Sequence, residues 1–149
     1  IGGAIKNIYA IAAGVAEGLN LGENAKSALI SRSFAEMTRY AKKFKADTKT
    51  WFGLSWLGDL ILTCSSKNSR NTQFGIKLAS SKYDNFLDLL KSQEVTEGYY
   101  TVKAVYNISQ KKNIDMPIME SVYNILYKQH DLKEELSNLL SRPITEEKI

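Results

Sequence analysis

The sequence contains little cysteine, histidine or proline, and each scarcity excludes a class of protein. One cysteine, Cys64, allows no internal disulfide and suits a reducing compartment. One histidine, His130, leaves no cluster of side chains with the spacing of metal ligands. Both prolines, Pro117 and Pro143, lie at the expected edges of helices, where proline is tolerated. The sequence therefore predicts neither a disulfide-stabilised nor a metal-centred domain.

Other absences reduce the range of possible functions further. No stretch of about 18 apolar residues is present, so we expect no membrane span. The apolar start of the chain contains Lys6, Asn7 and Glu17 and lacks a basic leader, so we expect no signal peptide and a cytoplasmic location. No glycine-rich phosphate loop follows a strand pattern. The net charge of +4 fits a phosphate-bearing small molecule, but also a weak contact with nucleic acid.

The periodicity of the chain is helical almost throughout. Residues 8–16 are apolar or small on every face, which is typical of a buried helix. Sustained alternation with period two is absent, so we predict an all-α fold with about eight helices in a single domain. A second helix carries a regular apolar stripe, formed by Ile30, Phe34, Met37, Ala41 and Phe44.

Several residues mark expected ends of helices. Asn24, Ser69 and Asp131 are predicted N-caps, and Pro117 suits the first position of a helix. Short helices are expected over residues 48–52 and from Asp84 onward. The aromatic residues Trp51, Phe52 and Trp56 are expected to lie in the core.

Three polar groups interrupt apolar or structured stretches and are candidates for chemistry. The first is Lys6 with Asn7, at the edge of the buried helix, where a lysine is either solvated or retained for proton transfer. The second is Asp59 with Thr63, four residues apart and so on one helix face. The third is Ser69-Arg70-Asn71, where backbone N–H groups at a helix start and a guanidinium make a site for phosphate.

Each group also has a purely structural interpretation. Lys6 would then be a solvated residue near a chain end, and Asp59 an N-cap or half of a structural ion pair. The Ser-Arg-Asn run would be an ordinary capped helix start. Together, however, the groups supply a candidate acid, a candidate orienting carboxylate and a phosphate cradle, as a site for a phosphorylated carbonyl compound requires.

These motifs, in this order, resemble a known family. Ala4-Ile5-Lys6-Asn7-Ile8, Gly53-Leu-Ser-Trp-Leu-Gly-Asp59 and Ser69-Arg70-Asn71, with Val95-Thr-Glu97-Gly later, are similar to NAD(P)-dependent glycerol-3-phosphate dehydrogenase. The resemblance is to the all-helical C-terminal substrate domain of the bacterial enzyme and covers nearly the whole chain. It implies a reaction that interconverts dihydroxyacetone phosphate and sn-glycerol 3-phosphate with NAD(P)H. The implied purpose of this reaction is to supply glycerol 3-phosphate for phospholipid synthesis.

The resemblance also implies a role for each site residue. Lys6 is similar to the catalytic lysine that protonates the C2 carbonyl oxygen, and Asp59 to the aspartate that orients it. The resemblance makes Asn7 and Thr63 supporting substrate contacts, and Ser69, Arg70 and Asn71 the phosphate-binding trio. It also makes Arg70, Val95 and Glu97 cofactor contacts.

The family pairs such a domain with an N-terminal Rossmann domain, which this sequence lacks. We therefore expect residues 1–142 to form the C-terminal helical substrate domain, with 143–149 a loose tail. Partners would be a triose phosphate and the missing Rossmann domain, and a homodimer stays open. The isolated chain is expected to bind no cofactor by itself and to have no useful turnover.

Three alternatives stay open at the level of sequence. The chain could be the helical half of another Rossmann-linked hydroxyacid dehydrogenase. It could be a basic nucleic-acid-binding module, although its Lys and Arg residues are scattered rather than clustered on one face. It could also be a purely structural or dimerising domain.

Overall fold

The computed structural model describes residues 2–45, 54–80, 89 and 96–142, and for residues 54–56 it describes the backbone alone. These parts of the chain contain helices and no strand, which confirms the predicted all-α fold. The helices are α1 (Gly2–Gly18), α2 (Glu23–Lys43), α4 (Leu54–Ser65), α5 (Arg70–Ser80), α7 (Glu97–Lys112), α8 (Pro117–Tyr127) and α9 (Leu132–Leu140).

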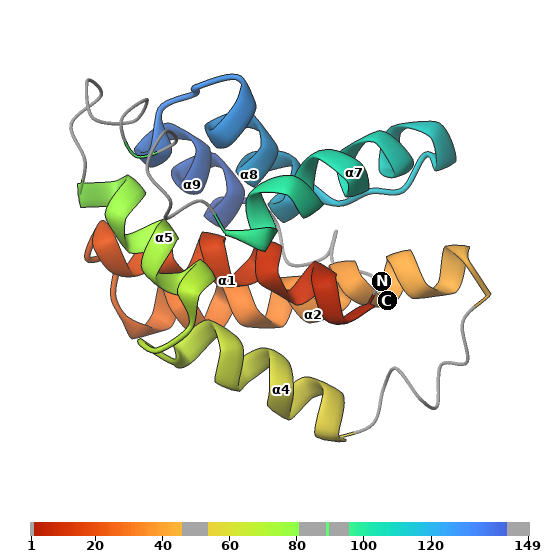
Figure 1. Cartoon of the computed structure of the whole chain (residues 1–149), viewed down its shortest axis with the longest axis horizontal. Coiled ribbons are helices and arrows are strands. Elements are labelled where there is room, and N and C mark those ends of the chain that lie inside the picture. The colour runs from red at the N-terminus through yellow and green to blue at the C-terminus, as the bar shows by residue number, and fades with distance from the viewer. Residues whose placement is uncertain (1, 46–53, 81–88, 90–95, 143–149) are drawn as a thin grey trace.

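Helix α1 is the centre of the molecule. It contacts α2, α4, α5, α7 and α8, and it lies between α4 on one side and the group of α7, α8 and α9 on the other (Figure 1). Residues 8–16 are all buried, as the apolar pattern on every face predicted. Because so many helices pack on α1, the polar residues of its first turns come close to residues from distant parts of the sequence.

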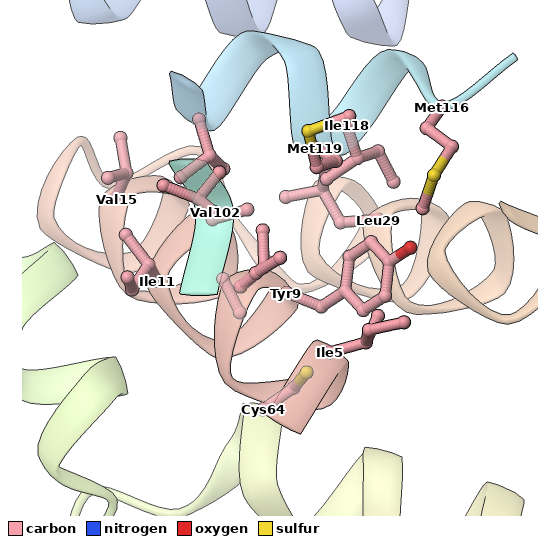
Figure 2. Close-up of a cluster of buried hydrophobic side chains, with 14 of the residues drawn as sticks. Ile5, Tyr9, Ile11, Val15, Leu29, Cys64, Val102, Met116, Ile118 and Met119 are labelled. Atoms are coloured by element: carbon pink, nitrogen blue, oxygen red, sulfur yellow. The ribbon is translucent and has the colours of Figure 1, made fainter. Parts of the chain in front are cut away.

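The core is a single cluster of aliphatic and aromatic side chains around α1. Figure 2 shows Ile5, Tyr9, Ile11 and Val15 of α1 facing side chains from α2, α7 and α8. Cys64 of α4 closes the cluster from below, and it is buried, as a single small apolar residue is expected to be. Burial raises the pKa of the Cys64 thiol to about 12, so the group is a packing residue rather than a nucleophile.

Helices α1 and α5 approach so closely that their backbones touch. A Cβ atom added at Gly14 would collide with the carbonyl oxygen of Thr72, and one at Gly75 with that of Ile11. Only glycine permits such an approach of two helix backbones. This contact fixes the direction of α5 relative to α1, and with it the position of Arg70 relative to Lys6.

The observed helix starts confirm most of the predicted ones. Ser69 accepts a hydrogen bond from the N–H of Thr72 (3.3 Å) and Asp131 from that of Lys133 (3.3 Å), while Pro117 begins α8. The prediction for Asn24 was wrong, because α2 begins at Glu23 behind Gly22, whose φ of 93° places it in the left-handed region that favours glycine.

The apolar stripe predicted for the second helix is only partly right. Met37 and Ala41 are buried, but Phe44 is 45% exposed, and the buried face of α2 includes Leu29, Glu36 and Tyr40. The predicted helices over 48–52 and from Asp84, the aromatic pair Trp51 and Phe52, the side chain of Trp56 and the tail 143–149 lie outside the described residues.

Glu36 is fully buried on this face of α2, and hydrogen bonds hold it there. Its carboxylate accepts hydrogen bonds from the N–H groups of Ile118 (2.8 Å) and Met119 (2.9 Å) at the start of α8, and from the hydroxyl of Tyr9 (3.2 Å). Glu36 therefore joins α1, α2 and the N-terminus of α8. Desolvation raises its pKa to about 8, although the two N–H donors and Arg39 lower it.

Candidate active site

Lys6 and Asp59 form an ion pair between α1 and α4. The Nζ atom of Lys6 lies 2.5 Å from Oδ2 of Asp59, and the two side chains are 26% and 50% exposed. An ion pair this exposed contributes little to the stability of a fold. Its significance is geometric, because it holds the ammonium group of a half-buried lysine in one place.

The turn between α4 and α5 is built to present backbone N–H groups. Ser69 precedes α5, and its hydroxyl caps the N–H of Thr72. The hydroxyl of Thr72 donates to the carbonyl oxygen of Thr63 (2.9 Å), which ties the start of α5 to the end of α4. The first N–H groups of a helix lack intrahelical acceptors, so the start of α5 at Arg70 suits an anion.

These two features face one cavity of about 450 Å³. Its lining includes most of the predicted site residues, namely Lys6, Asn7, Thr63, Ser69, Arg70, Asn71 and Glu97. Asp59 is joined to the cavity through its ion pair with Lys6. Val95, a predicted cofactor contact, lies outside the described residues. The fold thus brings together side chains that are up to about ninety positions apart in sequence.

The charges around the cavity suit a small anion. Two cations, Lys6 and Arg70, line it, and the N-termini of α5 and α7 both contribute to its wall. One carboxylate, that of Glu97 in the first turn of α7, lines it as well. A cavity of this volume is in the range of small-molecule sites, and its cations and N–H groups can bind a phosphate group beside a carbonyl or hydroxyl oxygen.

The sequence analysis missed four residues of the lining, Leu62, Ser66, Asn68 and Thr96. Ser66 and Asn68 belong to the polar turn before α5, so the position of Ser69 as N-cap was a signal that could have found them. Thr96 lies between the predicted positions Val95 and Glu97. Nothing in the sequence marks Leu62, a residue that is 68% exposed.

Within the described ranges, no group of three or more His, Cys, Asp or Glu side chains could hold a metal ion. None of the described helices has the length and hydropathy needed to cross a bilayer.

Comparisons with known proteins agree with the motifs. The family model described as the C-terminus of NAD-dependent glycerol-3-phosphate dehydrogenase matches residues 1–137. A relative named glycerol-3-phosphate dehydrogenase, from Solidesulfovibrio magneticus, is 47% identical over 148 residues, which cover 99% of this chain and 44% of the relative. Another, from Colwellia psychrerythraea, is 44% identical over 142 residues, which cover 95% of this chain and 42% of the relative.

The fold is also similar to that of a solved structure. The crystal structure of glycerol-3-phosphate dehydrogenase from Coxiella burnetii superimposes with a TM-score of 0.84 at 38% identity, over 95% of this chain and 43% of that one. The chain therefore spans less than half the length of the relatives it matches. With a family model that covers nearly all of its residues, the chain belongs to the family of C-terminal domains of NAD-dependent glycerol-3-phosphate dehydrogenase.

Proposed function

We propose that this chain supplies the substrate-binding and proton-donating half of a glycerol-3-phosphate dehydrogenase. The reaction interconverts dihydroxyacetone phosphate and sn-glycerol 3-phosphate with NAD(P)H. The observation that carries the proposal is the meeting of the Lys6–Asp59 ion pair and the Ser69-Arg70-Asn71 helix start at one cavity. Membership of the family supports the same reaction.

In this proposal the phosphate group of the substrate lies at the start of α5. The backbone N–H groups of Arg70 and Asn71 and the guanidinium of Arg70 donate to its oxygens, with the Ser69 and Asn71 side chains as neighbouring polar groups. With the phosphate fixed in this way, the C2 end of the triose is proposed to face Lys6, which lines the same cavity.

Lys6 is the proposed general acid. As a hydride reaches C2 of dihydroxyacetone phosphate, Nζ of Lys6 gives a proton to the carbonyl oxygen, which becomes the C2 hydroxyl of glycerol 3-phosphate. In the reverse direction the amine takes that proton back. Asp59 keeps the ammonium group in position, and Asn7 and Thr63 are proposed supporting contacts to the substrate.

The nicotinamide cofactor supplies the hydride when it is bound. The residues present fit one end of it, because the carboxylate of Glu97 suits a ribose hydroxyl, and the guanidinium of Arg70 has five N–H donors, enough to serve a cofactor oxygen as well as the substrate phosphate. A dinucleotide is several times larger than a triose phosphate, so a cavity of about 450 Å³ holds only its reacting end. We propose that a Rossmann domain, corresponding to the part of the relatives that the chain does not cover, binds the rest.

Titration of the chain with sn-glycerol 3-phosphate, followed by backbone amide NMR, tests the proposal. We expect saturable shifts at residues 69–72, and none with glycerol, which lacks the phosphate. Arg70→Ala should raise the Kd about tenfold or more, because a charge-assisted hydrogen bond is lost. Arg70→Lys, the matched control, keeps the charge but not the planar guanidinium. Its Kd should lie between those of the wild type and Arg70→Ala.

Equal affinity of the wild type and Arg70→Ala for the phosphate ester would contradict the proposal. Tighter binding of a non-phosphorylated 2-hydroxy acid than of sn-glycerol 3-phosphate would favour another hydroxyacid dehydrogenase instead.

A further inference from the structure

A buried hydrogen bond joins the start of α7 to the proposed phosphate site. The backbone N–H of Gly98, the second residue of α7, donates to Oδ1 of Asn71 (3.0 Å). Both residues are buried, with Asn71 only 7% exposed. A backbone N–H can only donate, so the oxygen of the Asn71 amide must face Gly98. The Nδ2 amino group is then the part of this side chain that can donate to an anion.

Gly98 also has no room for a side chain. A Cβ atom at this position would lie 2.6 Å from Oδ1 of Asn71, 2.7 Å from Cδ1 of Ile11 and 3.1 Å from the carbonyl oxygen of Asn7. The end of the Ile11 side chain can rotate away, but the Asn71 amide can move only by giving up its hydrogen bond to Gly98. The missing side chain at Gly98 is therefore what lets the Asn71 amide occupy its place in the cavity wall.

We propose that Gly98 is a positioning residue for the phosphate site: its N–H and its lack of a side chain fix the Asn71 amide so that Nδ2 donates to a phosphate monoester. Gly98 acts through Asn71 and has no contact of its own with the ligand. The inference rests on the proposed function, because it assumes that the cavity binds a phosphate group. Gly98 thus positions a phosphate-binding side chain, whereas its neighbour Glu97 is the proposed cofactor contact.

The affinity of the chain for sn-glycerol 3-phosphate tests this role. Gly98→Ala should raise the Kd about tenfold, as expected for the loss of one hydrogen bond to a charged group. Gly3→Ala is the matched control, since Gly3 is also the second residue of its helix and a Cβ there would meet nothing within 4 Å. The control should bind with an affinity close to that of the wild type.

A double-mutant cycle separates positioning from a general effect on folding. In the Asn71→Ala background the amide is already gone, so adding Gly98→Ala should change the Kd little further. It should also cost less stability in that background, because the clash with Oδ1 has been removed. A merely structural role would lower stability and leave the Kd of the folded fraction unchanged in both backgrounds.

Hydrogen exchange of the Gly98 amide provides a second measurement. The exchange itself is measured without ligand and without a substitution at Gly98, and the affinity of each Asn71 variant is measured separately. Asn71→Asp keeps an acceptor for this N–H and should keep its protection, but it should lose affinity for phosphate esters. Asn71→Ala should lose both. Unchanged protection in Asn71→Ala would overturn the inference.

The outcomes also separate this inference from the proposed function. If Arg70→Ala weakens binding but Gly98→Ala does not, the positioning role is wrong and the phosphate site stands. Equal weakening by Gly98→Ala with and without Asn71 would overturn it as well. If Arg70→Ala and the wild type bind alike, the proposed function is what fails.

Discussion

Lys6 and Glu36 both have ionisable side chains close to the core, and their surroundings differ. Lys6 keeps 26% of its side chain exposed and pairs with the exposed Asp59, whereas Glu36 is fully buried among N–H and O–H donors. Lys6 could be found from the sequence, because it and Asn7 stand out in a stretch whose other residues are apolar or small. Glu36 could not, because the mixed residues around it give no sign that the start of α8 would lie against it.

The burial of Glu36 predicts a specific dependence of stability on pH. A carboxyl whose pKa is higher in the folded chain than in the unfolded chain binds its proton more tightly when folded. The free energy of unfolding should therefore fall as the pH rises from about 4.3, the ordinary value for glutamate, towards about 8. Over that window the loss from this group should be on the order of a few kcal/mol.

Urea unfolding of the wild type and of Glu36→Gln, at several pH values across that window, checks this prediction. The variant should be less stable at low pH but should show a flatter pH dependence, since its side chain does not titrate. Ionisable groups that the two proteins share cancel in the comparison. Parallel curves for the two proteins would contradict the prediction and would mean that the donors on α8 fully offset desolvation.

Helices α1 and α5 show how one contact between elements sets the geometry of the site. Lys6 is on α1 and Arg70 begins α5, and the two helices are held together where Gly14 and Gly75 let their backbones touch. The sequence predicted the first helix from residues 8–16, which are apolar or small on every face, and the start of α5 from the cap at Ser69, but a glycine within a helical pattern only weakens the expectation of a helix. The close approach is a property of the pair of helices, so neither segment reveals it alone.

Gly75→Ala should therefore be strongly destabilising. The new Cβ would collide with backbone atoms of Ile11 and Val15, which cannot rotate away as a side chain can. We expect a loss of at least about 2 kcal/mol, in the range of overpacking in a closely packed core. Gly58→Ala is the control, because a Cβ there meets nothing within 4 Å and alanine favours a helix by about 1 kcal/mol. Denaturant unfolding that shows Gly75→Ala to be as stable as Gly58→Ala would contradict this account of the helix pair.

At the scale of the whole molecule, the sequence predicted the fold class, the family and the components of the site. It did so because helical periodicity, the caps at Ser69 and Asp131, and the order of short motifs are local properties. The meeting of the components was not a local property, since Lys6, Arg70 and Glu97 belong to three different helices. The central position of α1, which five other helices contact, is what brings them to one cavity (Figure 1).

A structure of the chain in complex with sn-glycerol 3-phosphate would test the central claim most directly. The account predicts the phosphate at the start of α5, bound by Arg70 and the first-turn N–H groups, with the C2 hydroxyl within hydrogen-bonding distance of Nζ of Lys6. A phosphate bound elsewhere on the molecule, or a C2 hydroxyl directed away from Lys6, would contradict it.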